Sequence, residues 1–428
     1  MNDLFETLPF RPADILLPKD CEYSKWSVVA CDQYTSQPEY WQRVEEYVGR
    51  SPSTLRLILP ESCLEGPNVE TDIMEINNTM SRYLREGRFV EHPNALFYVE
   101  RTLDNGKVRR GLMGMVDLEQ YDYEPGSSAP IRATEGTVLS RIPPRVAVRK
   151  NAPVELPHVM LLVDDPDQTV IEPLADQTGS MQVLYDFDLM ERGGHIKGWE
   201  LTEDQQAQVA RALSALADPA KFNARYGTKD EAVMLFAVGD GNHSLATAKE
   251  CYERQKRLTP PEHWANLPAR YALVELDNLH DASLEFEPIH RLVFGAKPEE
   301  LLEALTEYYP GAKRGDGAGH KLAYVYGETQ GVISVPDPAA QLPVGTLQNF
   351  LDWYLAQHKG VRVDYIHGAD VVRKLSAQPD TVGFLLPAMG KEELFPTVIR
   401  DGVLPRKTFS MGEAHDKRFY LEARKIRD

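Results

Sequence analysis

The chain has 428 residues, with 42% hydrophobic and 26% charged side chains, which is typical of a globular protein with two or three structural units. Its 65 acidic residues outnumber its 47 basic ones and give a net charge of −18. This charge disfavours nonspecific binding to nucleic acid or to an anionic membrane. No apolar run approaches the roughly 20 residues of a membrane span, and the N-terminal segment lacks the pattern of a signal peptide. We therefore expect a cytoplasmic protein that binds neither nucleic acid nor membranes.

The first predicted unit is an N-terminal α/β unit over residues 1–125. Segments 38–50 and 68–89 read as helices, the second because its apolar residues recur at three- and four-residue steps. Segment 94–118 is predicted to form two strands, because the Asn-Gly pair at 105–106 in its middle is a strong signal for a hairpin turn.

The central predicted unit, residues 126–292, is expected to hold the phosphate-binding and catalytic site. Helices are predicted over 201–218 and 242–258, and Thr202 and Gln205 have the spacing of a capping box at the start of the first helix. Strands are predicted over 158–165, 182–189 and 232–240.

The last predicted unit, residues 293–428, is a C-terminal α/β unit. Its predicted helices are 298–309, 347–358 and 369–378, and its predicted strands are 321–327, 331–335 and 381–389. Because helices and strands are interleaved along the whole chain, we predict a mixed α/β (α+β) fold.

The strongest candidate for a binding site is the turn "GDGNHSLATAK" between a predicted strand and a predicted helix. The first N–H groups of a helix are unpaired and carry the positive end of the helix dipole, so this turn favours phosphate. Asp240 is suited to hold Mg²⁺, and His243 to bond a phosphoryl oxygen or move a proton. Alternatively, Asp240 or Asn242 caps the helix, Gly241 permits the turn, and His243 is structural.

A second candidate is the basic segment 130–150, which surrounds Glu135. Guanidinium groups pair well with phosphate oxygens, so such a local excess of cations in an acidic protein suggests an anion pocket. The alternative is a solvated loop that balances nearby acidic surface. The cations of the segment are Arg132, Arg141, Arg145, Arg149 and Lys150.

A third candidate lies in segment 26–41, where a strand-like stretch ends before a predicted helix. Asp32, Gln33 and Tyr34 occupy this junction and are suited to recognise a small polar substrate. An ordinary capped turn remains the alternative.

Together, these three segments resemble the bacterial and archaeal family known as domain of unknown function 1015. The similarity extends over nearly the whole chain, from "FRPADILLP" and "SVVACDQYT" through "GLMGMVDLEQYDY" and "GDGNHSLATAK" to "GVLPRKTFSMG". The turn more common in this family, Asp-Gly-His-His-Arg, is similar to that of free-serine kinases in the ParB/sulfiredoxin superfamily. The resemblance implies a ParB/sulfiredoxin-like central core and phosphoryl transfer from a nucleotide to a serine hydroxyl.

The resemblance also implies roles for individual residues. Glu135 matches the glutamate that serves as base, and Arg145 lies where the family tends to place an arginine. Asp240, Gly241 and His243 match the turn that contacts phosphate and metal.

Two positions of the turn depart from the family pattern. Asn242 stands where the first histidine is usual, and Ser244 replaces the arginine. The lost guanidinium is a phosphate ligand, so Arg141, Arg145 or Lys249 would have to replace it.

The sequence thus predicts a small-molecule phosphotransferase acting on serine or a related hydroxylated metabolite. Its expected partners are that substrate and a phosphate donor, which is ATP, ADP or pyrophosphate, with Mg²⁺ as cofactor. A noncatalytic nucleotide- or metabolite-binding regulator and a hydrolase of small phosphoesters remain alternatives. The sequence predicts no oligomeric state.

Overall fold

The computed structural model describes residues 2–64, 66–137 and 139–427. Packing divides the chain into two compact units, Met1–Leu284 with Glu413–Asp428, and Glu285–Gly412. The second unit is therefore inserted into the first, which resumes when the chain returns at Glu413. The predicted division into three parts stays a prediction.

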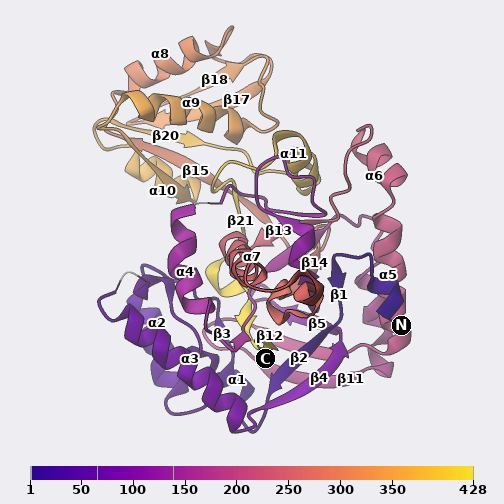
Figure 1. Ribbon diagram of the computed structural model, residues 1–428. Helices are drawn as coiled ribbons and strands as arrows, with labels where there is room; N and C mark the ends of the chain where they lie inside the picture. The colour runs from indigo at the N-terminus through magenta and orange to yellow at the C-terminus, as the bar shows by residue number, and fades with distance from the viewer. Residues whose placement is uncertain (1, 65, 138, 428) are drawn as a thin grey trace. The chain divides into compact units, whose positions relative to one another are not determined.

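The first unit is built on a large mixed sheet (Figure 1), so the predicted mixed α/β class is confirmed. The strands β10, β14, β13, β8 and β7 contribute its parallel pairs. In spatial order the strands are β11 (Gln182–Asp188), β12 (His195–Glu200), β5 (Phe97–Thr102), β6 (Val108–Asp117), β14 (Tyr271–Asn278), β10 (Met160–Val163), β13 (Phe236–Asp240), β8 (Ile131–Arg132) and β7 (Tyr121–Asp122), with β1 (Phe10–Arg11) beside β6.

The predicted hairpin is present as β5 and β6. The amide of Leu103 donates to the carbonyl of Lys107 at 2.8 Å, and Gly106 has a φ of 81°, a left-handed conformation that glycine adopts without steric cost. Strand β13 is shorter than predicted, since it begins at Phe236 and not at residue 232.

Helices cover the sheet of the first unit. The predicted capping box is confirmed, since the Thr202 side chain accepts from the Gln205 amide at the start of α5. Helices α5 and α7 pack apolar side chains, including Leu213 and Tyr252, into the core with Phe236 of the sheet. The helices of this unit are α1 (Tyr23–Trp26), α2 (Pro38–Val48), α3 (Val69–Arg85), α4 (Ile142–Arg149), α5 (Glu203–Leu216), α6 (Pro219–Tyr226) and α7 (Asn242–Lys256).

The last residues of the chain complete the first unit by pairing with segments far away in sequence. All of these pairings are antiparallel and short. The C-terminal pairs are β22 (Phe419–Tyr420) with β3 (Val28–Val29) and β23 (Arg424–Lys425) with β9 (Val154–Glu155). A separate pair in the N-terminal part joins β2 (Ala13–Pro18) and β4 (Phe89–Ala95).

The two faces of strand β14 differ in character. Ala272, Val274 and Leu276 point into the main hydrophobic core. Glu275 and Asp277 alternate with them, so their side chains lie on the opposite face, and both are buried. This face of the sheet therefore carries charged groups in the interior.

The second unit has its own antiparallel sheet and helices, in which the three predicted helices and the three predicted strands of this region are present. The strands at 286–294, 313–314, 362–367 and 409–411 and the helix at 394–401 were not predicted. The sheet order is β16 (Lys313–Arg314), β18 (Thr329–Val335), β17 (His320–Tyr326), β20 (Thr381–Leu385), β15 (Phe286–Phe294) and β19 (Arg362–His367), with β21 (Phe409–Met411) beside β15. Its helices are α8 (Pro298–Tyr308), α9 (Pro343–Gln357), α10 (Ala369–Leu375) and α11 (Leu394–Asp401).

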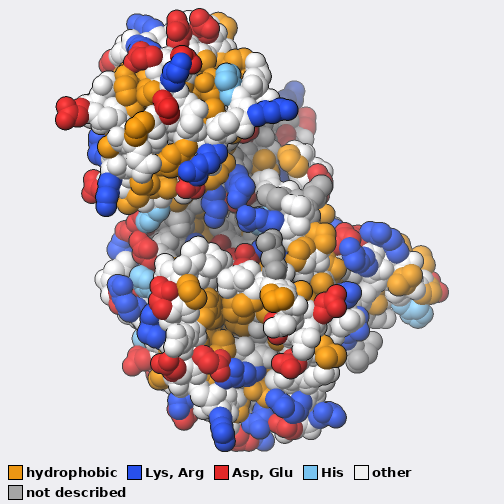
Figure 2. Space-filling view, turned by 90° about the vertical axis from the view of Figure 1, so that its left-hand side faces the viewer, with side chains coloured by type: hydrophobic (Ala, Val, Ile, Leu, Met, Phe, Trp, Pro, Cys, Tyr) orange, Lys and Arg blue, Asp and Glu red, His pale blue; other side chains and the backbone are white. Residues whose placement is uncertain are grey.

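The surface agrees with the composition. Figure 2 shows acidic and basic side chains interspersed with apolar ones over the visible face. No helix in the described ranges has the length and apolar character that crossing a bilayer requires.

Candidate functional site

The turn between β13 and α7 has the backbone geometry of an uncapped helix start. Gly241 occupies the N-cap position with a φ of 84° and has no side chain that could cap the helix. A Cβ at this position would lie 3.1 Å from the Cα of Val159, so the conformation favours glycine and the space for a side chain is tight. The positive end of the α7 helix dipole lies at this turn.

The alternative in which Asp240 or Asn242 caps the helix is not what the structure contains. Asp240 Oδ1 instead accepts from the adjacent Gly241 amide at 3.1 Å. The buried Asn242 side chain accepts from the Thr134 amide at 3.1 Å and donates to Thr134 Oγ1 at 3.2 Å. Because Thr134 Oγ1 also donates to the Val238 carbonyl at 2.6 Å, the turn is tied to the residue that precedes Glu135.

This contact brings together two of the predicted segments. Glu135 is half-buried and follows Thr134 directly, so its backbone lies beside the turn that carries Asp240 and His243. The departure at Asn242 has a structural reason, since its amide group makes two bonds to Thr134 that hold the segment of Glu135 in place.

The third predicted segment also reaches this region. Lys417, from the returning C-terminal segment, places its Nζ 3.6 Å from Asp240 Oδ2. The same lysine acts electrostatically on Asp32. Asp240 therefore forms an ion pair with this ammonium group, which also contributes to the electrostatic environment of Asp32.

The carboxylate of Asp32 is half-buried and ionised readily. Burial opposes its ionisation, but His158, a hydrogen bond from Gln33 and Lys417 outweigh this and hold the pKa of Asp32 below its ordinary value. Gln33 Nε2 donates to Asp32 Oδ1 at 3.0 Å, and His158 Nε2 lies 4.0 Å from Asp32 Oδ2. The other ring nitrogen of His158 bonds the Tyr420 hydroxyl at 2.7 Å, which fixes the orientation of the ring.

Tyr34 is placed differently from its two predicted companions. Its ring stacks on Tyr40 with 3.6 Å between centroids, and its backbone has a positive φ of 53°. Burial, followed by Glu191, raises the pKa of Tyr34. The Tyr34 ring therefore packs against Tyr40, and a bound substrate would have to contact Tyr34 without disturbing this packing.

The predicted arginines are mostly engaged within the protein. Arg145 forms an ion pair with Glu61 and also donates to the Arg141 carbonyl at 2.7 Å. Arg149 pairs with Glu155, and the buried Arg132 donates to two backbone carbonyls. Arg141 itself is exposed. These contacts show intramolecular partners rather than a cluster of guanidinium groups around one point.

The remaining predicted residues lie on α7. Lys249 donates to the Leu118 carbonyl at 2.7 Å and pairs with Glu253 at 3.1 Å. His243 and Ser244 are half-buried in the first turn, where the carbonyl of His243 accepts from Thr247.

Sequence reasoning did not find His158 or Lys417. His158 is the first residue of a predicted strand and has no motif around it. Lys417 lies 177 positions after Asp240, and only tertiary structure brings the two together. No local pattern marks either residue.

Asp240 is compatible with magnesium only together with a ligand. Mg²⁺ in phosphate sites is held by one or two carboxylates, with substrate phosphates and water supplying the other ligands. Within the part of the chain that the structure describes, Asp240 does not join two further His, Cys, Asp or Glu side chains in a ready-made metal cluster. The donor set thus fits a metal that arrives with phosphate.

The fold is that of a mixed α/β protein, with Asp240, Gly241 and Asn242 at the junction of β13 and α7. Residues 9–354 match the family described as "Protein of unknown function (DUF1015)". The chain belongs to this family, which confirms the predicted resemblance.

Solved structures with a similar fold include a free serine kinase. In complex with AMP, a variant of that kinase shares 12% sequence identity with the chain at a TM-score of 0.39, over 75% of this chain and 93% of that one. A conserved hypothetical protein from Pyrococcus furiosus shares 12% identity at a TM-score of 0.35, over 73% and 94% of the two chains.

A third similar structure is SbnI with a C-terminal truncation from Staphylococcus aureus. It shares 11% identity at a TM-score of 0.35, over 70% of this chain and 83% of that one. No match was found among curated proteins.

Proposed function

We propose that the protein is a phosphotransferase that moves a phosphoryl group to the hydroxyl of a small metabolite, serine or a relative. The observation that carries this proposal is the convergence at the uncapped start of α7. Asp240 belongs to this turn, the segment of Glu135 is tied to it through Thr134, and Asp32 shares the neighbourhood of Lys417.

The roles follow from the chemistry of each group. Glu135 takes the proton of the acceptor hydroxyl while the hydroxyl oxygen forms a bond to phosphorus. The bond between phosphorus and the donor oxygen breaks, and its electron pair leaves with the donor. The α7 amides and His243 stabilise the charge on the transferred group, since phosphoryl transfer depends mainly on positioning and charge stabilisation.

Asp32 and Gln33 are proposed to bind the acceptor. An ionised carboxylate suits the ammonium group of an amino acid, and the low pKa of Asp32 keeps it charged at neutral pH. The phosphate donor is proposed to be ATP, ADP or pyrophosphate. Asp240 would hold Mg²⁺, which neutralises phosphate charge when it binds with the donor.

Phosphorus NMR of the purified protein tests this proposal. The sample contains Mg²⁺, one of the three donors and a pool of hydroxylated amino acids. A new phosphomonoester signal that requires an acceptor supports transfer. Release of inorganic phosphate without an acceptor indicates a hydrolase, and donor binding without turnover indicates a regulator; either result overturns the proposal.

Glu135→Gln tests the assignment of the base. A positioned base contributes roughly 10²–10⁴-fold to the rate, so we expect transfer to fall by at least ~10²-fold. Donor-induced thermal stabilisation should persist, because the variant keeps the shape of the side chain. Glu70→Gln, on the exposed side of α3, makes the same chemical change away from the site and serves as control. A Glu135→Gln enzyme with the original rate would remove Glu135 from the role of base.

A further inference from the structure

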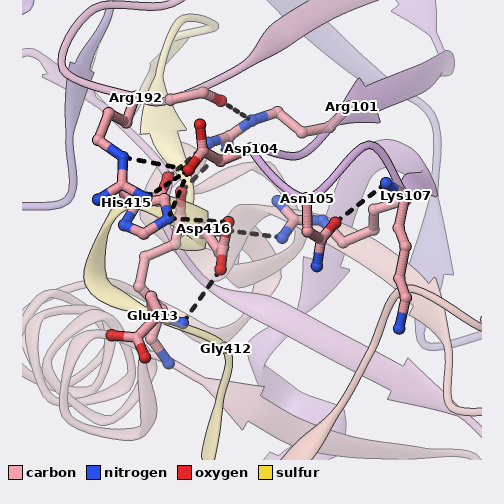
Figure 3. A network of polar contacts seen from close by, with 12 residues as sticks. Arg101, Asp104, Asn105, Lys107, Arg192, Gly412, Glu413, His415 and Asp416 are labelled. Carbon is pink, nitrogen blue, oxygen red and sulfur yellow. Dashed lines mark hydrogen bonds and ion pairs between the residues drawn. The ribbon is translucent and has the colours of Figure 1, made fainter.

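The segment that carries Lys417 is held in place by buried arginines. Arg101 donates to the His415 carbonyl at 2.8 Å and to the Lys417 carbonyl at 3.1 Å, and Arg109 donates to the Asp416 carbonyl at 2.8 Å. Figure 3 shows Arg101 reaching this segment from the sheet. The backbone on both sides of the Lys417 side chain is therefore fixed.

Further contacts secure the start of the same segment. The ring of His415 lies 3.8 Å from Asp104 and 3.7 Å from the carboxylate of Asp416, while Arg192 pairs with Asp104 (Figure 3). The Glu413 amide donates to Asp416 Oδ2 at 3.1 Å. So many anchors on a short, irregular segment indicate that the position of Lys417 matters.

Lys417 itself is 11% exposed, and its contact with Asp240 is an ion pair at 3.6 Å, longer than a charge-assisted hydrogen bond of about 2.7–2.9 Å. The ammonium thus faces the start of α7 without being fully bonded there. By contrast, Arg145 is bound to Glu61, and Lys249 to Leu118 and Glu253.

We propose that Lys417 is the phosphate-binding cation of this site, and that its ammonium exchanges the Asp240 carboxylate for a phosphate oxygen when Mg²⁺ and a phosphorylated ligand bind. This inference rests on the proposed function. The ligand it would take is a pyrophosphate group, free or in a nucleoside diphosphate or triphosphate. Lys417 thereby supplies from the end of the chain the positive charge that Ser244 cannot supply within the turn.

Calorimetric titration of the full chain with pyrophosphate and Mg²⁺ tests the role of Lys417. Removing a charge-assisted bond from a partly buried site should weaken binding by about tenfold or more in Lys417→Met. Lys417→Arg should restore most of the affinity, because it keeps the charge. Lys425→Met is the matched control, since this lysine pairs with Glu91 on the exposed surface. The variant should bind pyrophosphate as tightly as the unaltered protein does.

The outcomes separate this inference from the proposed function. If Lys417→Met binds pyrophosphate as tightly as the unaltered protein, the role of Lys417 is overturned, while phosphoryl transfer by the unaltered protein would still support the function. If the unaltered protein binds neither pyrophosphate nor ADP nor ATP, both proposals fall. Circular dichroism of each variant distinguishes lost binding from lost folding.

A second variant keeps the test decisive if Lys417→Met does not fold. In Asp240→Asn, the competitor for the ammonium is neutral, so pyrophosphate binding without metal should tighten. Adding Mg²⁺ should raise the pyrophosphate affinity of Asp240→Asn less than it raises that of the unaltered protein. Metal-free binding that stays the same or weakens in Asp240→Asn would overturn the proposed exchange.

Discussion

The two faces of strand β14 are stabilised in different ways. On one face, Leu276 and its neighbours pack into an apolar core, whose stabilisation grows with buried area and tolerates changes of shape. On the other face, Glu275 depends on two individual partners, Arg418 and Arg109. Burial opposes the ionisation of Glu275, yet these arginines hold its pKa below the ordinary value.

The charged face also restricts the strand beside it. Glu275 Oε1 and Asp277 Oδ1 would lie 2.7 and 2.8 Å from a Cβ placed on Gly111, so the neighbouring strand needs a glycine there. Arg418 further pairs with Glu422, and both come from the C-terminal segment. The apolar face therefore contributes stability that is widely shared, and the charged face specifies which segment covers it.

Arg418→Met should have the largest effect, because it leaves Glu275 and Glu422 buried and short of a partner. Breaking a buried ion pair in this way costs about 3–5 kcal/mol of unfolding free energy. Urea denaturation measures the loss. Arg254→Met, which removes an exposed pair with Glu250, is the control and should lose far less. Equal losses in the two variants would mean that the charged face contributes no specific stabilisation.

Leu276→Ala tests the apolar face with an effect of similar or smaller size. The side chain is fully buried, and truncating such a leucine costs roughly 2–5 kcal/mol. The same denaturation experiment applies. Leu258→Ala, at a residue that is 89% exposed, makes the same change with almost no packing to lose. We expect Leu276→Ala to leave pyrophosphate affinity unchanged at temperatures where it is folded.

Asp277→Asn should have the smallest effect, and its sign should depend on pH. Burial, reinforced by Glu275, raises the pKa of Asp277 well above its ordinary value, and both carboxylate oxygens lack a hydrogen-bond partner among the described residues. An acid with a raised folded pKa contributes stability fully below its unfolded pKa, about 4, and loses it as the pH rises through the folded value.

Relative to the unaltered protein, Asp277→Asn should therefore become more stable against unfolding as the pH rises from about 4. Denaturation curves at several pH values measure this difference. Asp167→Asn, in an exposed loop, is the control for the chemical change. A difference that stays constant over the whole range would show that folding does not raise the pKa of Asp277.

Local patterns predicted much of the fold. The Asn-Gly turn between β5 and β6 and the capping box of α5 depend on neighbouring residues, and both are present. Strand β14 was not predicted, because the polar residues in "YALVELDN" do not form the apolar run expected of an interior strand. The burial of Glu275 depends on Arg109 and on Arg418, which is 143 positions away.

In the candidate site, too, local features were predicted and contacts between distant residues were not. The glycine and the helix start at 241–242 follow from a short segment, and so did the prediction of an anion site there. The contacts of Asn242 with Thr134 and of Asp240 with Lys417 join residues more than a hundred positions apart. The roles of the predicted site residues stay predictions.

The insertion of the second unit sets an order in time during synthesis. Residues 285–412 leave the ribosome before Arg418 does, and domains generally fold as units while the chain is made. Glu275 must therefore remain without its main partner until an entire further unit has been translated. A nascent chain stopped before residue 413 would hold every strand of the large sheet but would leave Glu275 without Arg418, so the last residues close the fold.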